Sequence, residues 1–308
     1  MDTPVADLRA LVGRLNNLHE IFRVQGEILA CGEAAVEPLA ALLLSGPSPF
    51  PEPRVAAAEC LGAIGSEAAV AALIQVLDHY DLCALGPVQR FAEETVRNAA
   101  ARKLGRFRAP RVADALLLSL RRDHLIGAGQ ALADLRDTRA IPYLIECLED
   151  DYKKEKATEA LRRFGQAAVP NLCDAVQKPR SVAGVEAPLS RERRCRAAEL
   201  LGDLRAREAA RALEIACDDE TGEVRIACSV ALTRLGQASP QVLCQLIAGL
   251  EDADLLVRKT CEEALHEAGS KALTFVAAAA AGEPILIPPG GEICPSLSAR
   301  LIAIKILG

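Results

Sequence analysis

The sequence predicts an all-α fold in which about eight helical pairs stack into one right-handed superhelical solenoid spanning residues 1–308. Two observations support this: a composition suited to thin helix–helix contacts, and an internal repeat. Aromatic residues make up only 3% of the 308 residues, with no Trp and one Met. A compact core usually takes much of its burial from large rings. Here Ala and Leu dominate, and both rank high in helix propensity.

The repeat is marked by a leucine near the end of a helix, which we use as an anchor. A basic residue usually stands seven positions before it, and a small residue four positions before it, so both lie near one stripe of a helix. The anchors are Leu29, Leu61, Leu104, Leu132, Leu161, Leu201, Leu232, Leu265 and Leu307. The basic positions are Arg54, Arg97, Lys154, Arg194, Arg225, Arg258 and Arg300. The small positions are Ala57, Ala100, Ala128, Ala157, Ala197, Cys228, Cys261 and Ala303.

A second helix is predicted between successive anchors, as in EAAVAALIQVLDH and PQVLCQLIAGLEDA. Apolar residues recur there at intervals of three and four. Pro142, Pro170 and Pro240 fall in its first turn, where the missing N–H costs nothing. Each repeat is therefore a helix A, a turn and a helix B. We expect helix A on the outer face and helix B on the concave face, where a partner would bind.

The segments PRVAAAECLGAIG and EVRIACSVALTRLG resemble HEAT repeats of the short bacterial kind, called phycobilisome-lyase-type HEAT-like repeats. The resemblance extends over almost the whole chain. It implies a ladder of aspartates in the inter-helix turns and arginines early in helix B, which holds neighbouring repeats together. Asp219 and Arg225, and Asp252 and Arg258, are both six residues apart. The other arginines assigned to this structural ladder are Arg54, Arg97, Arg194 and Arg300.

Four insertions separate helix A from helix B within a repeat: residues 45–53, 79–90, 179–191 and 283–297. Each contains Pro or Gly and is predicted to be a loop on a common rim of the solenoid. Two of them carry apolar residues that we expect to be exposed, namely Phe50 and the cluster Ile285, Leu286 and Ile287. Apolar loop residues either pack back on the solenoid or contact a partner.

The charge is unevenly distributed along a chain whose net charge is −6. Residues 101–200 hold 20 Lys/Arg against 14 Asp/Glu, whereas the segments on either side are acidic. A basic stretch of this kind predicts contact with the acidic surface of another protein, while the alternative is that it only solvates helix ends. The candidate binding residues are Arg102, Lys103, Arg106, Arg108, Arg111, Arg121, Arg122, Arg191, Arg193 and Arg196.

Cysteine usage and the termini bear on location. The eleven cysteines are odd in number and include no CxxC pair, which favours reduced thiols in a cytoplasmic protein. No secretory signal or membrane-spanning stretch is expected. The apolar helix at residues 299–307 has no polar cap after it, and this makes it a candidate for self-association.

Enzyme classes built on related repeats were compared with the chain. The resemblance to deoxyhypusine hydroxylase implies iron-binding His-Glu pairs after the basic column, but this sequence has other residues there. Those residues are Val55, Asn98, Glu155, Cys195, Ile226 and Lys259. DNA glycosylases of the HEAT-like class are disfavoured by the net negative charge. No catalytic residue, metal site or cofactor is predicted, which weighs against an enzyme without deciding the question.

The sequence therefore predicts a non-catalytic scaffold or adaptor that binds a protein on its concave face and loop rim. The alternative is a protein resembling the phycobilin lyases, acting in chromophore maturation or as a chaperone, with Cys83 and Cys294 as its loop thiols. A weaker alternative is nucleic-acid contact through the basic middle segment, which the net charge makes unfavourable. The sequence does not identify the partner or the pathway.

Overall fold

The computed structural model describes residues 5–182, 185–287 and 291–307, apart from the side chains at positions 5, 6, 182, 286, 287, 291 and 293. The predicted all-α solenoid of the HEAT type is confirmed. The chain divides into two compact units, residues 1–147 and residues 148–308, and each unit is described by itself. The organisation of the whole chain as a single domain stays a prediction.

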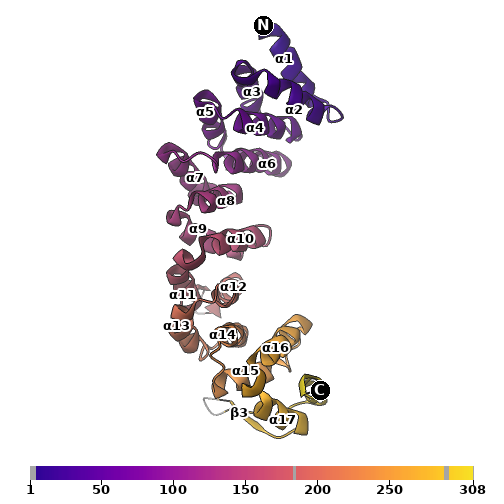
Figure 1. Cartoon of the computed structure of the whole chain (residues 1–308), viewed down its shortest axis with the longest axis vertical. Coiled ribbons are helices and arrows are strands. Elements are labelled where there is room, and N and C mark those ends of the chain that lie inside the picture. The colour runs from indigo at the N-terminus through magenta and orange to yellow at the C-terminus, as the bar shows by residue number, and fades with distance from the viewer. Residues whose placement is uncertain (1–4, 183–184, 288–290, 308) are drawn as a thin grey trace. The chain divides into compact units, whose positions relative to one another are not determined.

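Unit 1 is built of helices joined by short turns (Figure 1). Its helices are α1 (Val5–Gly13), α2 (Ile21–Ala30), α3 (Val36–Leu43), α4 (Glu52–Ile64), α5 (Glu67–Val76), α6 (Pro87–Leu104), α7 (Pro110–Asp123), α8 (Ile126–Leu135) and α9 (Ile141–Glu146). In Figure 1, α4, α6 and α8 lie on one side of this unit, and α5 and α7 lie on the other. Helix A of each repeat is thus odd-numbered, and helix B is even-numbered.

Unit 2 continues the same alternation (Figure 1). Its helices are α10 (Lys154–Phe164), α11 (Val169–Gln177), α12 (Pro188–Asp203), α13 (Ala210–Ala216), α14 (Gly222–Arg234), α15 (Pro240–Gly249), α16 (Leu255–Ala268), α17 (Leu273–Ala281) and α18 (Leu297–Leu307). Across the described parts of both units, an odd-numbered helix packs against the even-numbered helix that follows it in eight pairs, in agreement with the predicted number. They are α1/α2, α3/α4, α5/α6, α7/α8, α11/α12, α13/α14, α15/α16 and α17/α18.

Two of the insertions contain short antiparallel hairpins, which the sequence had indicated only as loops. The strands β1 (Ser181–Val182) and β2 (Val185–Glu186) precede α12, with Ser181 opposite Glu186. The strands β3 (Ile285–Ile287) and β4 (Gly291–Ile293) precede α18, with Ile285 opposite Ile293. Both hairpins therefore stand at the entry to an even-numbered helix of unit 2.

The column of small residues forms a buried seam in each unit. Every member from Ala57 to Ala303 has 0% of its surface exposed. The anchors from Leu61 to Leu265 are also buried, whereas Leu29 is 41% and Leu307 is 43% exposed, because each lies in a terminal repeat. A small side chain at this position lets neighbouring helices approach closely. Ala occupies it in some repeats and Cys in others, because both are small.

Arginines of the basic column donate to backbone carbonyls in the last turn of an odd-numbered helix or in the turn that follows it. Arg54 Nε donates to the carbonyl of Leu43 at 2.8 Å, and Arg194 Nε donates to the carbonyl of Val176 at 2.7 Å. The same pattern is repeated by Arg97 with the Tyr80 carbonyl, Arg225 with Asp219, Arg258 with Asp252 and Arg300 with Ala280. The last carbonyls of a helix have no partner within it, and a cation there also interacts favourably with the helix dipole.

The aspartates take a different part in this ladder from the one expected. The guanidinium of Arg225 binds the carbonyl of Asp219, not its carboxylate. The Asp219 carboxylate instead accepts hydrogen bonds from Arg194, one repeat earlier, and therefore links two repeats. The Asp252 carboxylate accepts from the N–H of Asp254 and caps the turn before α16. The spacing of six thus reflects a backbone contact within the repeat.

A close approach of α8 to α6 requires glycine at position 127. A Cβ atom there would lie 2.8 Å from the carbonyl oxygen of Asn98 and 2.9 Å from its Cα. We expect Gly127→Ala to lower the free energy of unfolding of unit 1 by about 1–3 kcal/mol, because the backbone of α6 would have to shift. Urea unfolding followed by circular dichroism measures this loss. Gly26→Ala on α2, where nothing lies within 4 Å, is the control, and it should stabilise by about 0.5–1 kcal/mol. Equal effects of the two substitutions would contradict the proposed clash.

Candidate groove on the even-numbered helices of unit 2

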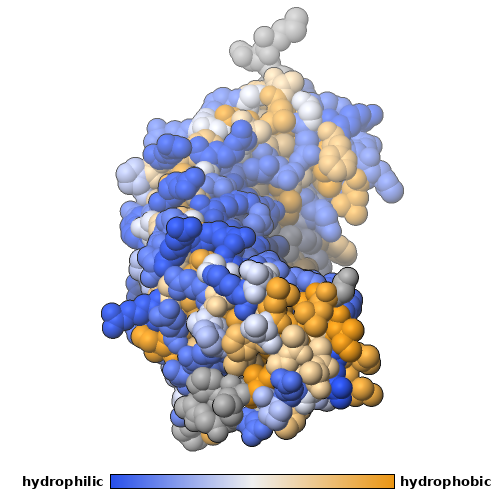
Figure 2. All heavy atoms as spheres, turned by 60° about the horizontal axis from the view of Figure 1, so that its bottom comes forward, coloured by the Kyte–Doolittle hydropathy of each residue, from blue (hydrophilic) through white to orange (hydrophobic). Residues whose placement is uncertain are grey.

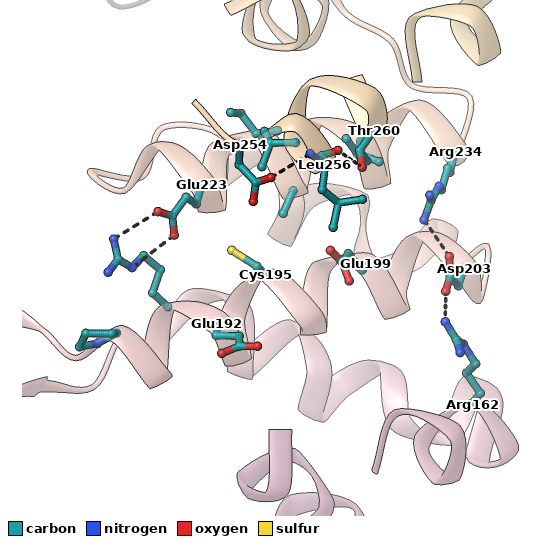
Figure 3. A pocket seen from close by; sticks show the side chains of 16 residues that line it. Arg162, Glu192, Cys195, Glu199, Asp203, Glu223, Arg234, Asp254, Leu256 and Thr260 are labelled. Atoms are coloured by element: carbon teal, nitrogen blue, oxygen red, sulfur yellow. Dashed lines mark hydrogen bonds and ion pairs between the residues drawn. The ribbon is translucent and has the colours of Figure 1, made fainter. Parts of the chain in front are cut away.

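A groove of about 640 Å³ crosses α10, α12, α14 and α16 of unit 2 (Figure 3). One wall is apolar: Ile226, Ala227 and Val230 come from α14, and Leu256 and Val257 come from α16. Leu256 is 69% exposed, although it stands at the start of a helix that packs on α14. An apolar side chain held at the mouth of a groove is a common feature of binding sites.

The start of α16 is set by Asp254, which fixes where Leu256 is placed. The Asp254 carboxylate accepts a hydrogen bond from the N–H of Leu256 at 2.8 Å, as an N-cap residue does. Helix α16 therefore begins with its Leu255-Leu256 pair directly behind the cap, and both leucines are 69% exposed. The cap keeps Leu256 on the groove side, where Figure 3 shows it facing α12.

The opposite wall is polar and comes from one face of α12. Glu192, Cys195, Glu199 and Asp203 follow one another at intervals of three or four residues, so they share that face. Glu192 pairs with Lys154 at 2.6 Å. Asp203 pairs with Arg162 at 2.6 Å and with Arg234 at 2.8 Å. Cys195 and Glu199 lie between these two ion pairs and point into the groove (Figure 3).

An ion pair between Arg191 of α12 and Glu223 of α14 forms the remaining rim of the groove. Nη1 and Nε of Arg191 each lie 3.3 Å from a carboxylate oxygen of Glu223. Five carboxylates line the groove against three arginines, and only Glu199 among the five has neither a hydrogen bond nor an ion pair within the described structure. The groove therefore offers an apolar surface beside a carboxylate that makes no hydrogen bond or ion pair among the described residues.

The surroundings of the half-buried Cys195 thiol disfavour its thiolate form. Burial, together with the negative charges of Glu199 and Glu223, raises the pKa of this thiol to about 12. The thiolate is the reactive form of cysteine. Hence the groove is suited to non-covalent contacts, and its cysteine behaves as a small apolar side chain.

Thiol labelling tests this assignment. In the native protein at pH 7.5, we expect iodoacetamide to modify Cys83 and Cys294 first, because both are exposed, and Cys195 far more slowly. Mass spectrometry of timed samples gives the three rates. The denatured chain is the control, in which the three rates should become similar. Labelling of Cys195 as fast as that of Cys83 in the native protein would contradict the raised pKa.

The structure separates the ten predicted basic residues into distinct environments. Five form exposed or half-buried ion pairs with acidic partners: Lys103 with Glu59, Arg111 with Glu67, Arg122 with Asp78 and Asp123, Arg191 with Glu223 and Arg196 with Glu155. Four are exposed and make no ion pair among the described residues: Arg102, Arg106, Arg108 and Arg121. The expected contact with an acidic surface therefore stays a prediction, and it rests mainly on these four residues of unit 1.

Arg193 was predicted to be a binding residue with the other nine, but its side chain is buried. It is only 4% exposed, donates to the carbonyl of Lys178 at 2.7 Å and lies 3.3 Å from Glu149. Its position next to Arg194 on α12 turns it inward, toward the segment that precedes the β1–β2 hairpin. Arg193 thus supports the fold and is not available to a partner.

The predicted apolar loop residues also differ from one another. Phe50 is 71% exposed, as expected. Ile285 is only 6% exposed, so the expectation of an exposed side chain there is wrong, because β3 packs against α15 and α17. The side chains of Leu286 and Ile287 lie outside the described residues.

The fold places this chain among the α-solenoid proteins built of HEAT-type repeats. The PBS lyase HEAT-like repeat family matches residues 53–79 and 126–150, so the chain contains repeats of that family. No curated protein matches the sequence significantly. No helix of the described chain has the length and hydrophobicity that crossing a bilayer requires. In the same part of the chain, no three or more His, Cys, Asp or Glu side chains are grouped so that they could hold a metal ion.

Several solved structures are similar to the chain. Human deoxyhypusine hydroxylase in complex with glycerol is 21% identical, with 86% of this chain and 96% of that chain covered and a TM-score of 0.33. The complex of CpcE and CpcF of phycocyanin lyase from Nostoc sp. PCC7120 is 24% identical, with coverages of 88% and 86% and a TM-score of 0.31. An engineered protein is 16% identical, with coverages of 98% and 94% and a TM-score of 0.34. Similarity at this level carries no argument about activity.

Proposed function

We propose that this chain is a non-catalytic interaction scaffold that binds another protein on its even-numbered helices. The groove of unit 2 carries the proposal, because it combines an apolar wall, on which Leu256 is exposed, with a carboxylate that has no ion pair among the described residues. Protein interfaces typically join an apolar centre to a polar rim in this way. The repeated hairpins supply a rigid support for such a surface.

Unit 1 supports the same function with a different surface. Three of the six phenylalanines are strongly exposed: Phe22 is 88%, Phe91 is 74% and Phe50 is 71% exposed. Phe22 and Phe91 stand near the first turn of α2 and α6, and Phe50 stands just before α4. Aromatic side chains are enriched at the energetic centres of protein interfaces. We infer that the entry ends of these even-numbered helices form a second contact region.

The experiment for the groove is capture of a partner from the native host by the immobilised full chain. We expect the captured set to lose at least one protein when Leu256→Arg places a charge on the apolar wall. Ile215→Arg is the matched control, since Ile215 is 57% exposed on α13, an odd-numbered helix. Identical sets for the wild type and Leu256→Arg would refute the groove as the binding surface. Circular dichroism of both variants verifies that the fold is kept.

Self-association through the C-terminal helix remains a proposal with its own test. Leu297, Leu301 and Ile304 are 71%, 59% and 53% exposed and lie along one stripe of α18. Figure 2 shows hydrophobic side chains gathered at the C-terminal end of unit 2, which that view brings forward. Size-exclusion chromatography with light scattering should show a dimer that Leu301→Glu converts to a monomer. A monomer for the wild type at micromolar concentration would remove this proposal.

The family match makes chromophore maturation the second candidate function. A tetrapyrrole carries propionates, which would require paired basic groups, whereas carboxylates outnumber arginines in the groove. We therefore expect no absorbance shift when the chain is incubated with a free bilin. A shift that Leu256→Arg abolishes would favour the chromophore function over the scaffold.

A further inference from the structure

The unpaired carboxylate of Glu199 distinguishes the groove from the rest of the acidic surface around it. Its neighbours on α12 are each neutralised, Glu192 by Lys154 at 2.6 Å and Asp203 by Arg162 at 2.6 Å. Glu199 lies two turns after Glu192 and one turn before Asp203, and no described side chain or backbone group donates to it. The chain thus provides cations for the ends of this acidic row and leaves its centre open.

The groove around Glu199 disfavours the charged form of its side chain, although the residue as a whole is exposed. The carboxylate stays reachable by solvent, but the groove surrounds it, and this burial raises the pKa of Glu199 above its ordinary value despite the nearby Arg196 and Arg234. A charged group that is partly removed from water without a partner is unfavourable. A donor supplied by a bound molecule would relieve that cost, because it would complete the row of ion pairs on α12.

The wall that faces Glu199 defines what kind of donor fits. Half-buried Ile226 on α14 and exposed Leu256 on α16 present apolar surface within the same groove, and Figure 3 shows Leu256 there. Lysine and arginine side chains have an apolar stem and a cationic tip. Such a side chain could lay its stem against this wall and direct its tip to the carboxylate. An acidic or purely apolar side chain would satisfy only one of the two surfaces.

We propose that the groove is the docking site for a lysine- or arginine-bearing segment of a partner protein, with the basic side chain paired to Glu199. This inference rests on the scaffold function proposed above and specifies the partner's chemistry at one site. Arginine should be preferred to lysine, since its planar fork can bind both carboxylate oxygens while its stem remains on the apolar wall. It concerns unit 2 and is independent of the expected acidic contact at the unpaired arginines of unit 1.

Synthetic peptide libraries test the inference directly on the full-length chain. Each library has seven residues, with degenerate flanks lacking cysteine and a fixed centre of Arg, Lys, Gln or Glu. Fluorescence polarisation at 50 mM and at 300 mM salt reports binding. We expect at least tenfold tighter binding of the Arg and Lys libraries than of the Gln and Glu libraries, with a smaller difference at high salt because exposed charges are screened.

Two matched variants tie this preference to the groove. Glu199→Gln should abolish the preference for basic centres, whereas Glu214→Gln should keep it, since Glu214 is an exposed glutamate on α13 without an ion pair in the described structure. Glu199→Gln should also leave the melting temperature at pH 7 unchanged or raised, because the unpaired charge is removed. A residue that only supported the fold would lower it.

The outcomes separate the inference from the scaffold function. If no library binds, or if neutral and acidic centres bind as well as basic ones, the inference is overturned. It is also overturned if Glu199→Gln retains the preference. A partner capture that Leu256→Arg abolishes would still support the scaffold in each of those cases. Loss of both results would reject the scaffold together with the inference.

Discussion

Replacing Glu93 with glutamine is expected to lower the free energy of unfolding of unit 1 by about 3 kcal/mol. Glu93 lies on α6 with only 1% of its surface exposed. Its carboxylate accepts from Arg54 of α4 at 2.5 Å and from Arg97 at 3.3 Å, and both of those arginines are also buried. Removing the negative charge between these two buried guanidinium groups leaves Arg54 without a carboxylate partner among the described residues and leaves Arg97 with Asp123 alone, at 3.4 Å.

The measurement is urea unfolding of Glu93→Gln, with Glu94→Gln as the matched control on the same helix. Glu94 is only half-buried and makes no ion pair among the described residues, so its neutralisation should change the stability by less than about 0.5 kcal/mol. The wild type and the two variants should keep the same helical content before the transition. Equal midpoints for the two variants would show that the Arg54–Glu93–Arg97 cluster does not hold α4 to α6.

Removing Arg194 is expected to destabilise unit 2 by a similar amount, about 3 kcal/mol. Arg194 is 1% exposed, donates to the Val176 carbonyl at 2.7 Å and pairs with Glu186 at 2.9 Å and with Asp219. Arg194→Met keeps the length of the side chain but removes the donor of a helix-end carbonyl and the cation shared by two partly buried carboxylates, which keep only neutral donors from Thr221 and Ser190. The β1–β2 hairpin would lose its ion pair with α12, because Glu186 is part of that hairpin, and would keep the hydrogen bond from Ser190 to Glu186.

The pH dependence of stability should change in the same variant. Burial alone would raise the pKa of Asp219, but hydrogen bonds from Arg194 and from the N–H of Thr221 hold that pKa below its ordinary value. A carboxyl group with a lowered pKa in the folded state stabilises the protein above about pH 4 and loses this contribution as the pH falls through the folded pKa. Arg194→Met should therefore flatten the acid side of the stability curve, between pH 5 and pH 2.

Arg225→Met is the matched control, since Arg225 occupies the same column one repeat later. Its guanidinium donates to the backbone carbonyls of Asp219 and Glu220 at 2.7 and 3.0 Å and forms no ion pair in the described structure. We expect a loss of about 1 kcal/mol and an unchanged acid slope. The assignment of Asp219 to Arg194 would be wrong if both variants flattened the acid slope equally.

Much of the fold could be predicted from spacing alone. The small column and the basic column lie four and seven residues before an anchor leucine, and every position of the small column from Ala57 onward is buried in the structure. In a helix, residues separated by such intervals lie on one stripe, so their spacing in the sequence predicts that they are close in space. This holds only within one helix. The partner of Arg194 is Asp219, 25 residues away, whereas the spacing of six pointed to Arg225.

In the candidate site, too, sequence spacing predicts which residues share a helix face but not which residues of other helices they contact. The row of Glu192, Cys195, Glu199 and Asp203 could be read from the sequence as one face of α12, but nothing in it marked Glu199 as unpaired. That distinction depends on Lys154 of α10 and Arg234 of α14, which reach the ends of the row from other repeats. Arg193 was misplaced for a related reason: Arg193 and Arg194 are both buried whereas Arg191 and Arg196 on the same helix are not, and only packing decides which arginines of α12 are buried.

By itself, the sequence determined that this protein is a stack of helical hairpins, where the hairpins begin and end, and which small residues form the seam. These properties depend on intervals of three, four and seven residues along a single helix. The tertiary structure alone decided which charges are neutralised and where a groove remains open. Ion pairing and burial depend on side chains that come from different repeats. The number of residues between two such side chains does not tell whether they are in contact.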